Sequence, residues 1–215
     1  KEKVLNLVRE TPLFAVIRGL DPDKLIKTID ALIKGGVKII EITMDSKYSL
    51  DMLKVANSYV DNKNIAVGAG TVLNTKTTRS AITAGSDFIV SPVLNTDVIE
   101  VSKEYNKIVI PGVMTPTEIM KAWDTGADFV KVFPAKTVGP QFIKSVKGPL
   151  SQVEIIPTGG INLDNVEDFI KAGSAAVGVG SSLISKEEIK KGNYDQITKK
   201  AELFIEKLKA KNWYV

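Results

Sequence analysis

Short hydrophobic runs rich in Val and Ile recur along the chain. Each is followed by a Gly, Pro or Thr and then by an amphipathic stretch of helical length. This order is typical of β/α units, in which a buried strand leads into a helix that covers it. The runs predict eight strands, at residues 13–18, 37–43, 65–70, 87–91, 108–112, 128–133, 153–158 and 175–180.

The amphipathic stretches between these runs predict the helices. Several begin at residues that cap helices well, such as Asn95 and Thr115. Several end at glycines that recur in a weak internal repeat, as at Gly85, Gly126 and Gly173. The predicted helices span residues 1–10, 22–34, 47–60, 75–84, 95–105, 116–125, 139–147, 162–172 and 194–211.

Eight β/α units in a chain of 215 residues predict a closed (β/α)8 TIM barrel of the α/β class. Residues 1–215 would form a single domain, with an extra N-terminal helix at 1–10. The alternative is a doubly wound open sheet, which would carry a G-x-G-x-x-G turn after its first strand. The residues at that place, Arg18-Gly19-Leu20-Asp21, do not match this pattern, so the sequence favours the barrel.

Composition narrows the chemistry that this chain can perform. It is 44% hydrophobic and 25% charged and contains no His and no Cys. These absences exclude thiolate nucleophiles, Ser-His triads and most transition-metal sites, so no metal is expected. The net charge is +4, but the lysines are interleaved with acidic residues, so no nucleic-acid partner is expected. No apolar run reaches the roughly 20 residues of a membrane span and the start lacks a signal-peptide core, so we expect a cytoplasmic protein without a membrane partner.

Charged residues interrupt three of the predicted strands near their carboxyl ends. Two-residue alternation places Lys131 between two phenylalanines on the face that points into a barrel. Glu41 and Thr43 share the corresponding face of the second strand, and Arg18 ends the first. Burial disfavours the charged form of an amine, and a neutral amine attacks carbonyl carbons while a nearby carboxylate moves protons. Lys131 and Glu41 thus predict Schiff-base chemistry. The alternatives are a buried structural ion pair and, for Arg18, a surface arginine.

Two glycine-rich segments follow the last two predicted strands. They are Pro157-Thr158-Gly159-Gly160-Ile161 and Gly178-Val179-Gly180-Ser181-Ser182. Glycines allow the backbone to approach an anion, and barrels commonly bind phosphate in these two loops. The pair therefore predicts a phosphate site, and the alternative is two tight turns. A third segment, Gly68-Ala69-Gly70-Thr71, is weaker because glycines at strand ends often serve close packing.

Taken together, these motifs resemble the 2-keto-3-deoxy-6-phosphogluconate (KDPG) aldolases and the 4-hydroxy-2-oxoglutarate (KHG) aldolases grouped with them. The resemblance runs from about residue 12 to about residue 183. No single motif decides it, but their order along the chain is highly specific. The matching segments are 15–18, 35–37, 41–43, 68–72, 91–92, 111–118, 131–135, 157–161 and 178–181.

The resemblance implies a class I aldolase that cleaves KDPG to pyruvate and glyceraldehyde 3-phosphate without a cofactor, with KHG as a further substrate. Lys131 would form the Schiff base, Glu41 would be the general acid and base, and Thr71 would lie near the pyruvyl carboxylate. A homotrimer and a place in the Entner-Doudoroff pathway are also implied. The remaining implied contacts are Pro92 and Phe133 in the pocket wall and Gly159, Gly160, Gly180 and Ser181 around the phosphate.

One position departs from the family pattern. Many members follow the glutamate with Thr-Leu-Arg-Thr, whose arginine helps to hold the substrate, whereas this chain has Thr43-Met44-Asp45-Ser46. The pyruvyl carboxylate still needs a cationic or hydrogen-bonding partner, so we expect Arg18 to bind it with help from Thr71. Thr43 is also expected to bind the substrate.

Three other functions stay open at this point. The substrate could be 2-keto-3-deoxy-6-phosphogalactonate (KDPGal), which differs from KDPG at one stereocentre. A phosphate-binding isomerase or decarboxylase would keep the glycine loops and use Lys131 as a charge or a base without a covalent bond. A barrel used as an assembly scaffold would leave the pair of Lys131 and Glu41 unused.

Overall fold

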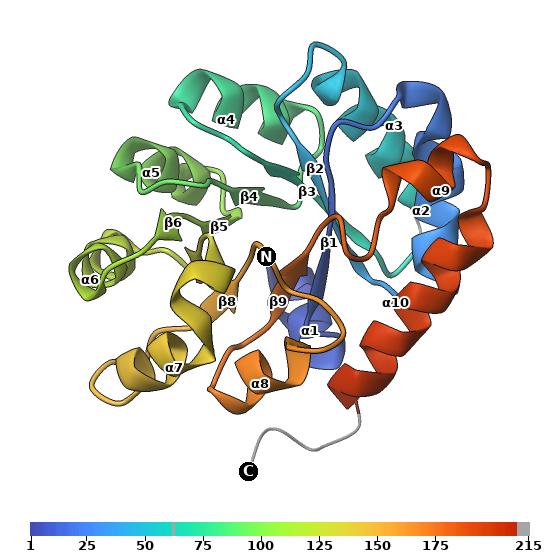
Figure 1. Cartoon of the computed structure of the whole chain (residues 1–215). Coiled ribbons are helices and arrows are strands. Elements are labelled where there is room, and N and C mark those ends of the chain that lie inside the picture. Colours follow the sequence, from blue (N-terminus) through green and yellow to red (C-terminus); the bar gives the residue numbers. More distant parts are fainter. Residues whose placement is uncertain (62, 210–215) are drawn as a thin grey trace.

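The structure is a computed structural model that describes residues 1–61 and 63–209. Strands and helices alternate along these residues, and Figure 1 shows the helices arranged around the strands. The strands are β1 (Leu13–Ile17), β2 (Ile39–Thr43), β3 (Ala66–Gly70), β4 (Phe88–Val90), β5 (Ile108–Ile110), β6 (Gly112–Val113), β7 (Val130–Val132), β8 (Ile155–Pro157) and β9 (Val177–Val179). The helices are α1 (Glu2–Glu10), η1 (Pro22–Lys24), α2 (Leu25–Lys34), α3 (Ser49–Val60), α4 (Thr75–Thr83), α5 (Thr96–Glu104), α6 (Pro116–Thr125), α7 (Ala135–Lys147), α8 (Val166–Lys171), α9 (Lys186–Lys190) and α10 (Tyr194–Lys209).

The predicted order of β/α units is confirmed, with differences at particular elements. The predicted strand at 108–112 is divided into β5 and β6 at Pro111, which has no N–H to donate to a neighbouring strand. The helix predicted at 139–147 begins earlier, at Ala135, and is kinked at Gly139, where φ is 70°. Helix α9 was not predicted. The last two residues of the helix predicted at 194–211 lie outside the described residues.

The strands of the described chain pair in parallel and form two sheets. One sheet has six strands in the order β5-β4-β3-β2-β1-β9, and the other has three in the order β6-β7-β8. The two sheets approach each other at the end of β8, where Thr158 and Gly178 form a parallel bridge. The Ala175 N–H also donates to the Ile155 carbonyl over 2.9 Å. The fold is therefore an α/β fold with parallel strands in a curled sheet, and the carboxyl ends of these strands meet on one side.

Two-residue alternation divides the strand side chains between two hydrophobic clusters. Ile40 and Ile42 of β2 belong to the cluster between the strands and the helices. Phe14, Phe88 and Phe129 belong to the second cluster, on the concave side of the sheets, where the rings of Phe14 and Phe88 meet edge to face at 5.4 Å between centroids. Glu41 and Lys131 lie on this concave side by the same alternation.

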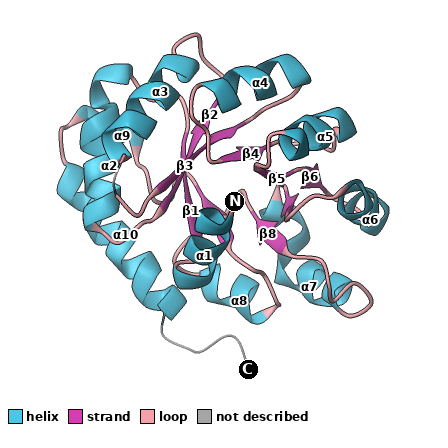
Figure 2. Ribbon diagram, turned by 180° about the vertical axis from the view of Figure 1, so that it is seen from behind, coloured by secondary structure: helices cyan, strands magenta, loops and turns pink. Residues whose placement is uncertain are grey.

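Helix α1 closes the concave side at the amino ends of the strands. Its buried residues Val4, Leu7 and Val8 belong to the same cluster as the phenylalanines. Two ion pairs tie its start to distant strands: Lys1 Nζ lies 2.5 Å from Asp128 Oδ1, and Lys3 Nζ lies 3.4 Å from Asp87 Oδ2. In the view from behind, α1 lies inside the arrangement of the other helices (Figure 2). The carboxyl ends of the strands are thus left as the open side.

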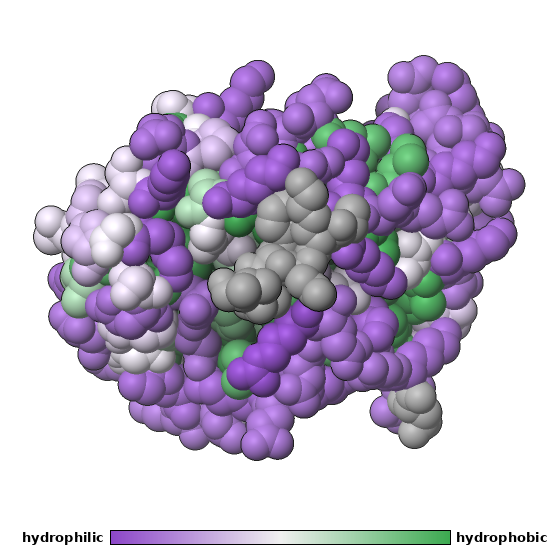
Figure 3. All heavy atoms as spheres, turned by 90° about the horizontal axis from the view of Figure 1, so that it is seen from below, coloured by the Kyte–Doolittle hydropathy of each residue, from purple (hydrophilic) through white to green (hydrophobic). Residues whose placement is uncertain are grey.

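The surface seen from below is mostly hydrophilic, and hydrophobic side chains appear on it as small areas among polar ones (Figure 3). None of the helices in the described part of the chain has both the length and the apolar character that crossing a membrane requires.

Candidate active site

A buried lysine and a buried glutamate face each other near the carboxyl ends of β7 and β2. Lys131 Nζ lies 3.9 Å from Glu41 Oε1, and each side chain is 3% exposed. The carboxylate oxygen Oε1 accepts no hydrogen bond from any described residue. A separation of 3.9 Å is too long for a hydrogen bond. The pair is thus buried but incompletely satisfied, which suits groups that act on a ligand better than a structural ion pair.

The neighbouring strand makes room for the glutamate side chain. Thr43 of β2 is paired with Gly70 of β3, so the end of β3 runs beside the Glu41 carboxyl group. The three atoms nearest to a Cβ built on Gly70 all belong to Glu41. A side chain at position 70 would therefore displace the carboxylate. The glycine that ends the third predicted strand serves close packing, as its motif indicated, and what it packs against is Glu41.

Arg18 forms a polar cluster with side chains from the ends of β2 and β3. Its Nη2 donates to Thr71 Oγ1 over 3.2 Å, and its Nε lies 3.8 Å from Asp45 Oδ2. The Thr43 hydroxyl lies 2.9 Å from Asp45 Oδ1 and 3.2 Å from the Ile17 carbonyl oxygen. Asp45 therefore stands beside Arg18, which directly follows β1.

Thr71 adopts an unusual backbone conformation, with φ at 56°, where side chains other than glycine are rarely found. This conformation places its hydroxyl at the Arg18 guanidinium. Strained residues of this kind are concentrated at functional sites.

Phe133 connects the buried pair with the glycine loops. Lys131 Nζ lies 5.2 Å from the centroid of the Phe133 ring, within the range of a cation–π contact. A Cβ built on Gly159 would lie 3.1 Å from Cε2 of the same ring. Pro92, which follows β4, packs through its backbone on Gly112, the residue that pairs with Lys131 in the sheet.

The two glycine loops present free backbone donors. Gly159 and Gly160 have φ values of 93° and 83°, which favour glycine. The Gly159 N–H faces the Gly178 carbonyl in the parallel bridge between Thr158 and Gly178. Within residues 1–61 and 63–209, the N–H groups of Gly160 and Ser181 donate to no acceptor. Unpaired N–H groups that converge on one place bind anions well.

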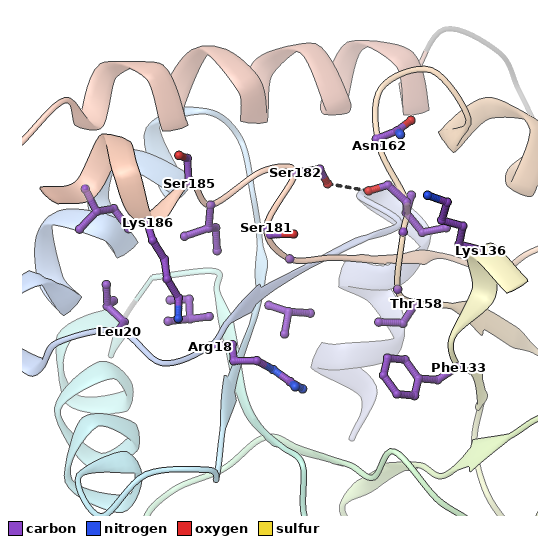
Figure 4. A pocket seen from close by; sticks show the side chains of 18 residues that line it. Arg18, Leu20, Phe133, Lys136, Thr158, Asn162, Ser181, Ser182, Ser185 and Lys186 are labelled. Atoms are coloured by element: carbon purple, nitrogen blue, oxygen red, sulfur yellow. Dashed lines mark hydrogen bonds between the residues drawn. The ribbon is translucent and has the colours of Figure 1, made fainter. Parts of the chain in front are cut away.

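These loops border a cavity of about 710 Å³ (Figure 4). Six of the predicted site residues line it: Arg18, Phe133, Gly159, Gly160, Gly180 and Ser181. The other five, Lys131, Glu41, Thr43, Thr71 and Pro92, do not line it. Two of them adjoin residues that do line it: Lys131 contacts the Phe133 ring, and Thr71 accepts a hydrogen bond from Arg18. The structure thus places the predicted residues in two neighbouring groups, one that lines the cavity and one around Lys131 and Glu41.

Two lysines that line the cavity were not predicted. Lys136 lies in the first turn of α7, and Lys186 is the first residue of α9. A signal for α9 was present in the sequence, because Ser185 and Glu188 have the spacing of a helix-capping pair. In the structure the Ser185 hydroxyl accepts a hydrogen bond from the Glu188 N–H.

Comparison with known proteins agrees with the geometry of the site. The family model described as KDPG and KHG aldolase matches residues 4–200. This chain belongs to the KDPG and KHG aldolase family. The matched residues include Lys131, Glu41 and both glycine loops.

Curated members of the family are similar over most of their length. The 2-dehydro-3-deoxy-phosphogluconate aldolase of Haemophilus influenzae is 32% identical over 197 residues, which is 91% of this chain and 92% of that protein. The 2-dehydro-3-deoxy-6-phosphogalactonate aldolase of Escherichia coli is 34% identical over 174 residues, which is 80% of this chain and 84% of that protein.

A solved structure in the family captures a reaction intermediate. The KDPG aldolase of Legionella pneumophila, with pyruvate as a covalent carbinolamine, superposes with a TM-score of 0.86 at 27% identity. The match covers 93% of this chain and 96% of that one. The fold of this family member is thus shared with a KDPG aldolase that forms a covalent bond to pyruvate.

Proposed function

We propose that this chain is a class I aldolase that cleaves KDPG to pyruvate and glyceraldehyde 3-phosphate. The observation that carries the proposal is the buried pair of Lys131 and Glu41, whose Nζ and Oε1 lie 3.9 Å apart on the concave side of the sheets. The pair stands beside a cavity with free backbone donors for a phosphate group. The family and its named relatives support the same reaction.

In this mechanism Lys131 and Glu41 share the covalent and proton-transfer steps. The neutral amine of Lys131 adds to the C2 ketone, and the carbinolamine loses water with help from Glu41 to give an iminium ion. Glu41 then takes the proton of the C4 hydroxyl while the C3–C4 bond breaks, and the electron pair of that bond forms an enamine. Glyceraldehyde 3-phosphate leaves, protonation at C3 restores the iminium ion, and water releases pyruvate and Lys131.

The surrounding residues hold the two ends of the substrate in this proposal. Arg18, Thr71 and Thr43 bind the pyruvyl carboxylate, and Pro92 and Phe133 line the space around the reacting carbons. Gly159, Gly160, Gly180 and Ser181 bind the phosphate through backbone N–H groups and the serine hydroxyl. Positioning both ends fixes the C3–C4 bond between Lys131 and Glu41.

The test is covalent trapping. Pyruvate and borohydride should attach a reduced adduct to Lys131, located by mass spectrometry of peptides, and Lys131→Ala should lose both labelling and pyruvate release. Lys144→Ala is the matched control, because Lys144 is exposed on α7 and does not line the cavity. Labelling spread over surface lysines, with turnover surviving in Lys131→Ala, would contradict the Schiff-base mechanism. It would favour the non-covalent isomerase or decarboxylase.

KDPGal is a second candidate substrate, because the chain is 34% identical to the Escherichia coli enzyme named for it. KDPG and KDPGal differ at one stereocentre, so the same groups can cleave both. The ratio of kcat/KM for the two compounds decides between them. We propose KDPG as the better substrate, and a ratio below one would reverse this order.

The proposal also includes a closed eight-stranded barrel formed by residues 1–215 as a single domain. Support comes from the bridge between Thr158 and Gly178 and from the short break between β5 and β6, which lie on different sheets. If these links close the barrel, amide hydrogen exchange should protect β8 and β9 as strongly as β1 and β2. Fast exchange confined to β8 and β9 would show an open edge.

We further propose a cytoplasmic homotrimer that acts on small molecules in the Entner-Doudoroff pathway, without nucleic-acid or membrane partners. Phosphorylated keto acids are charged and do not cross membranes unaided, so an enzyme that consumes them works inside the cell. Leu73 and Val93 are each 50% exposed and lie on two neighbouring loops. The side-chain amide of Asn95 links these loops by donating a hydrogen bond to the Leu73 carbonyl oxygen over 3.2 Å. These side chains suit a contact between subunits. Light scattering of wild type and Leu73→Glu tests the trimer.

A further inference from the structure

The cavity has three cationic side chains and no acidic side chain among the residues that line it. Its 18 lining residues include Arg18, Lys136 and Lys186 and no Asp or Glu. Arg18 is partly neutralised by Asp45, which lies 3.8 Å away. Within the described residues neither lysine forms an ion pair or a side-chain hydrogen bond. The two lysines are therefore the cations of this cavity that remain available to a ligand.

Lys136 is held against the glycine loop after β8. Its Cδ and Cγ would lie 3.0 Å and 3.1 Å from a Cβ built on Gly160, so its aliphatic stem lies along the backbone of that glycine. The Lys136 N–H also donates to the Gly159 carbonyl over 2.9 Å. Because residue 160 has no side chain, the ammonium group can lie close to the unpaired N–H group of Gly160.

Lys186 reaches the cavity from the other side. Its Nζ would lie 2.8 Å from a Cβ built on Gly19, the residue that follows Arg18. Figure 4 shows Lys186 on the side of Leu20 and Arg18, and Lys136 on the side of Thr158 and Asn162, with the cavity between them. A ligand in the cavity thus meets a free ammonium group on each side.

Resting on the proposed function, we propose that Lys136 and Lys186 are specificity-determining residues that favour a keto acid ending in a phosphate over one ending in a carboxylate. A phosphate monoester carries a charge of about −1.5 to −2 and three acceptor oxygens, whereas a carboxylate carries one charge and two oxygens. Two ammonium groups added to the backbone donors of Gly160 and Ser181 provide more charge and more donors than a carboxylate, with one charge and two oxygens, can use. The additional charge and donors therefore strengthen binding of a phosphate more than binding of a carboxylate.

The experiment compares kcat/KM for KDPG and for KHG, whose far end is a carboxylate, in Lys136→Gln and Lys186→Gln. The ratio of kcat/KM for KDPG to kcat/KM for KHG should fall about five- to tenfold in each variant. Each variant loses one hydrogen bond from an exposed lysine ammonium group to the charged phosphate. Lys144→Gln and Lys190→Gln are the matched controls, because these lysines are exposed on the same two helices and do not line the cavity. An unchanged ratio in both cavity variants would overturn the proposal.

A binding measurement separates this proposal from the proposed function. Calorimetric titration with glycerol 3-phosphate needs no turnover, and its affinity should fall about five- to tenfold in each cavity variant relative to the controls. If the cavity variants lose this affinity while wild-type protein is not labelled by pyruvate and borohydride, the phosphate preference holds and the aldolase mechanism fails. Equal affinity in wild type, cavity variants and controls would overturn the role of the lysines even in an active aldolase.

Discussion

Replacing Gly70 by alanine tests whether catalysis depends on the position of the Glu41 carboxyl group. A Cβ at position 70 would lie 2.5 Å from Glu41 Cδ and 2.6 Å from its Cγ, whereas ordinary contacts begin near 3.4 Å. The carboxyl group must therefore move by about 1 Å, and a misplacement of this size can lower a rate by about 100-fold. The extra methyl group should also lower the free energy of unfolding by about 1–3 kcal/mol, the usual effect of overpacking.

The assay couples pyruvate release to lactate dehydrogenase and follows NADH. In Gly70→Ala, kcat should fall by about 100-fold while thermal melting still shows a folded protein. Gly148→Ala is the control, because Gly148 has a negative φ and the nearest atom to its added Cβ is the Ser145 carbonyl oxygen at 3.4 Å. A folded Gly70→Ala enzyme with kcat within about threefold of wild type would show that the reaction does not depend on where Glu41 lies.

Three further changes test separate parts of the site and the fold. Glu41→Gln keeps the size of the side chain and removes the base, so kcat should fall by about 10² to 10⁴; an unchanged kcat would assign proton transfer to another group. Arg18→Leu should raise KM for KDPG at least about tenfold, while Lys131 is still labelled at high pyruvate concentration. An unchanged KM at low salt would show that Arg18 is a surface arginine that does not bind the substrate. Glu118 accepts hydrogen bonds from the Met114 N–H and from the Thr115 hydroxyl and N–H, which hold its pKa below the usual 4.5. Its contribution to stability is therefore complete above pH 4.5 and is lost as the pH falls through the lowered pKa. The difference in free energy of unfolding between wild type and Glu118→Gln, measured in urea, should shrink below pH 4.5, and a constant difference would count against this cause.

The sequence predicted most of the elements and the buried pair because both depend on local pattern. Alternation over a few residues was enough to place Lys131 and Glu41 on one side of their strands. The glycine loops were also predicted from local pattern, because glycines after two consecutive strands let the backbone approach an anion. In the structure Gly159 and Gly160 have positive φ values, which favour glycine.

Other features depend on contacts between residues far apart in the chain, and the pattern could not reveal them. Lys136 and Lys186 resemble exposed helix lysines in the sequence, and their place at the cavity follows from how α7 and α9 pack beside Gly160 and Gly19. In the sequence, Asp45 only stands where many family members have an arginine. In the structure it is a partner of Arg18, which lies 27 residues earlier in the chain.

The ion pairs of α1 also constrain the order in which the chain can fold during synthesis. The helix is made before every strand that it packs against, yet its partners Asp87 and Asp128 leave the ribosome many residues later. The apolar face of Val4, Leu7 and Val8 therefore has no complete binding place until more than half of the chain is synthesised. Until then the nascent chain exposes both this face and the concave side of its first strands. The docking of α1 is thus a late event at the ribosome, and the preceding interval is when the nascent chain is most open to aggregation or to capture by a chaperone.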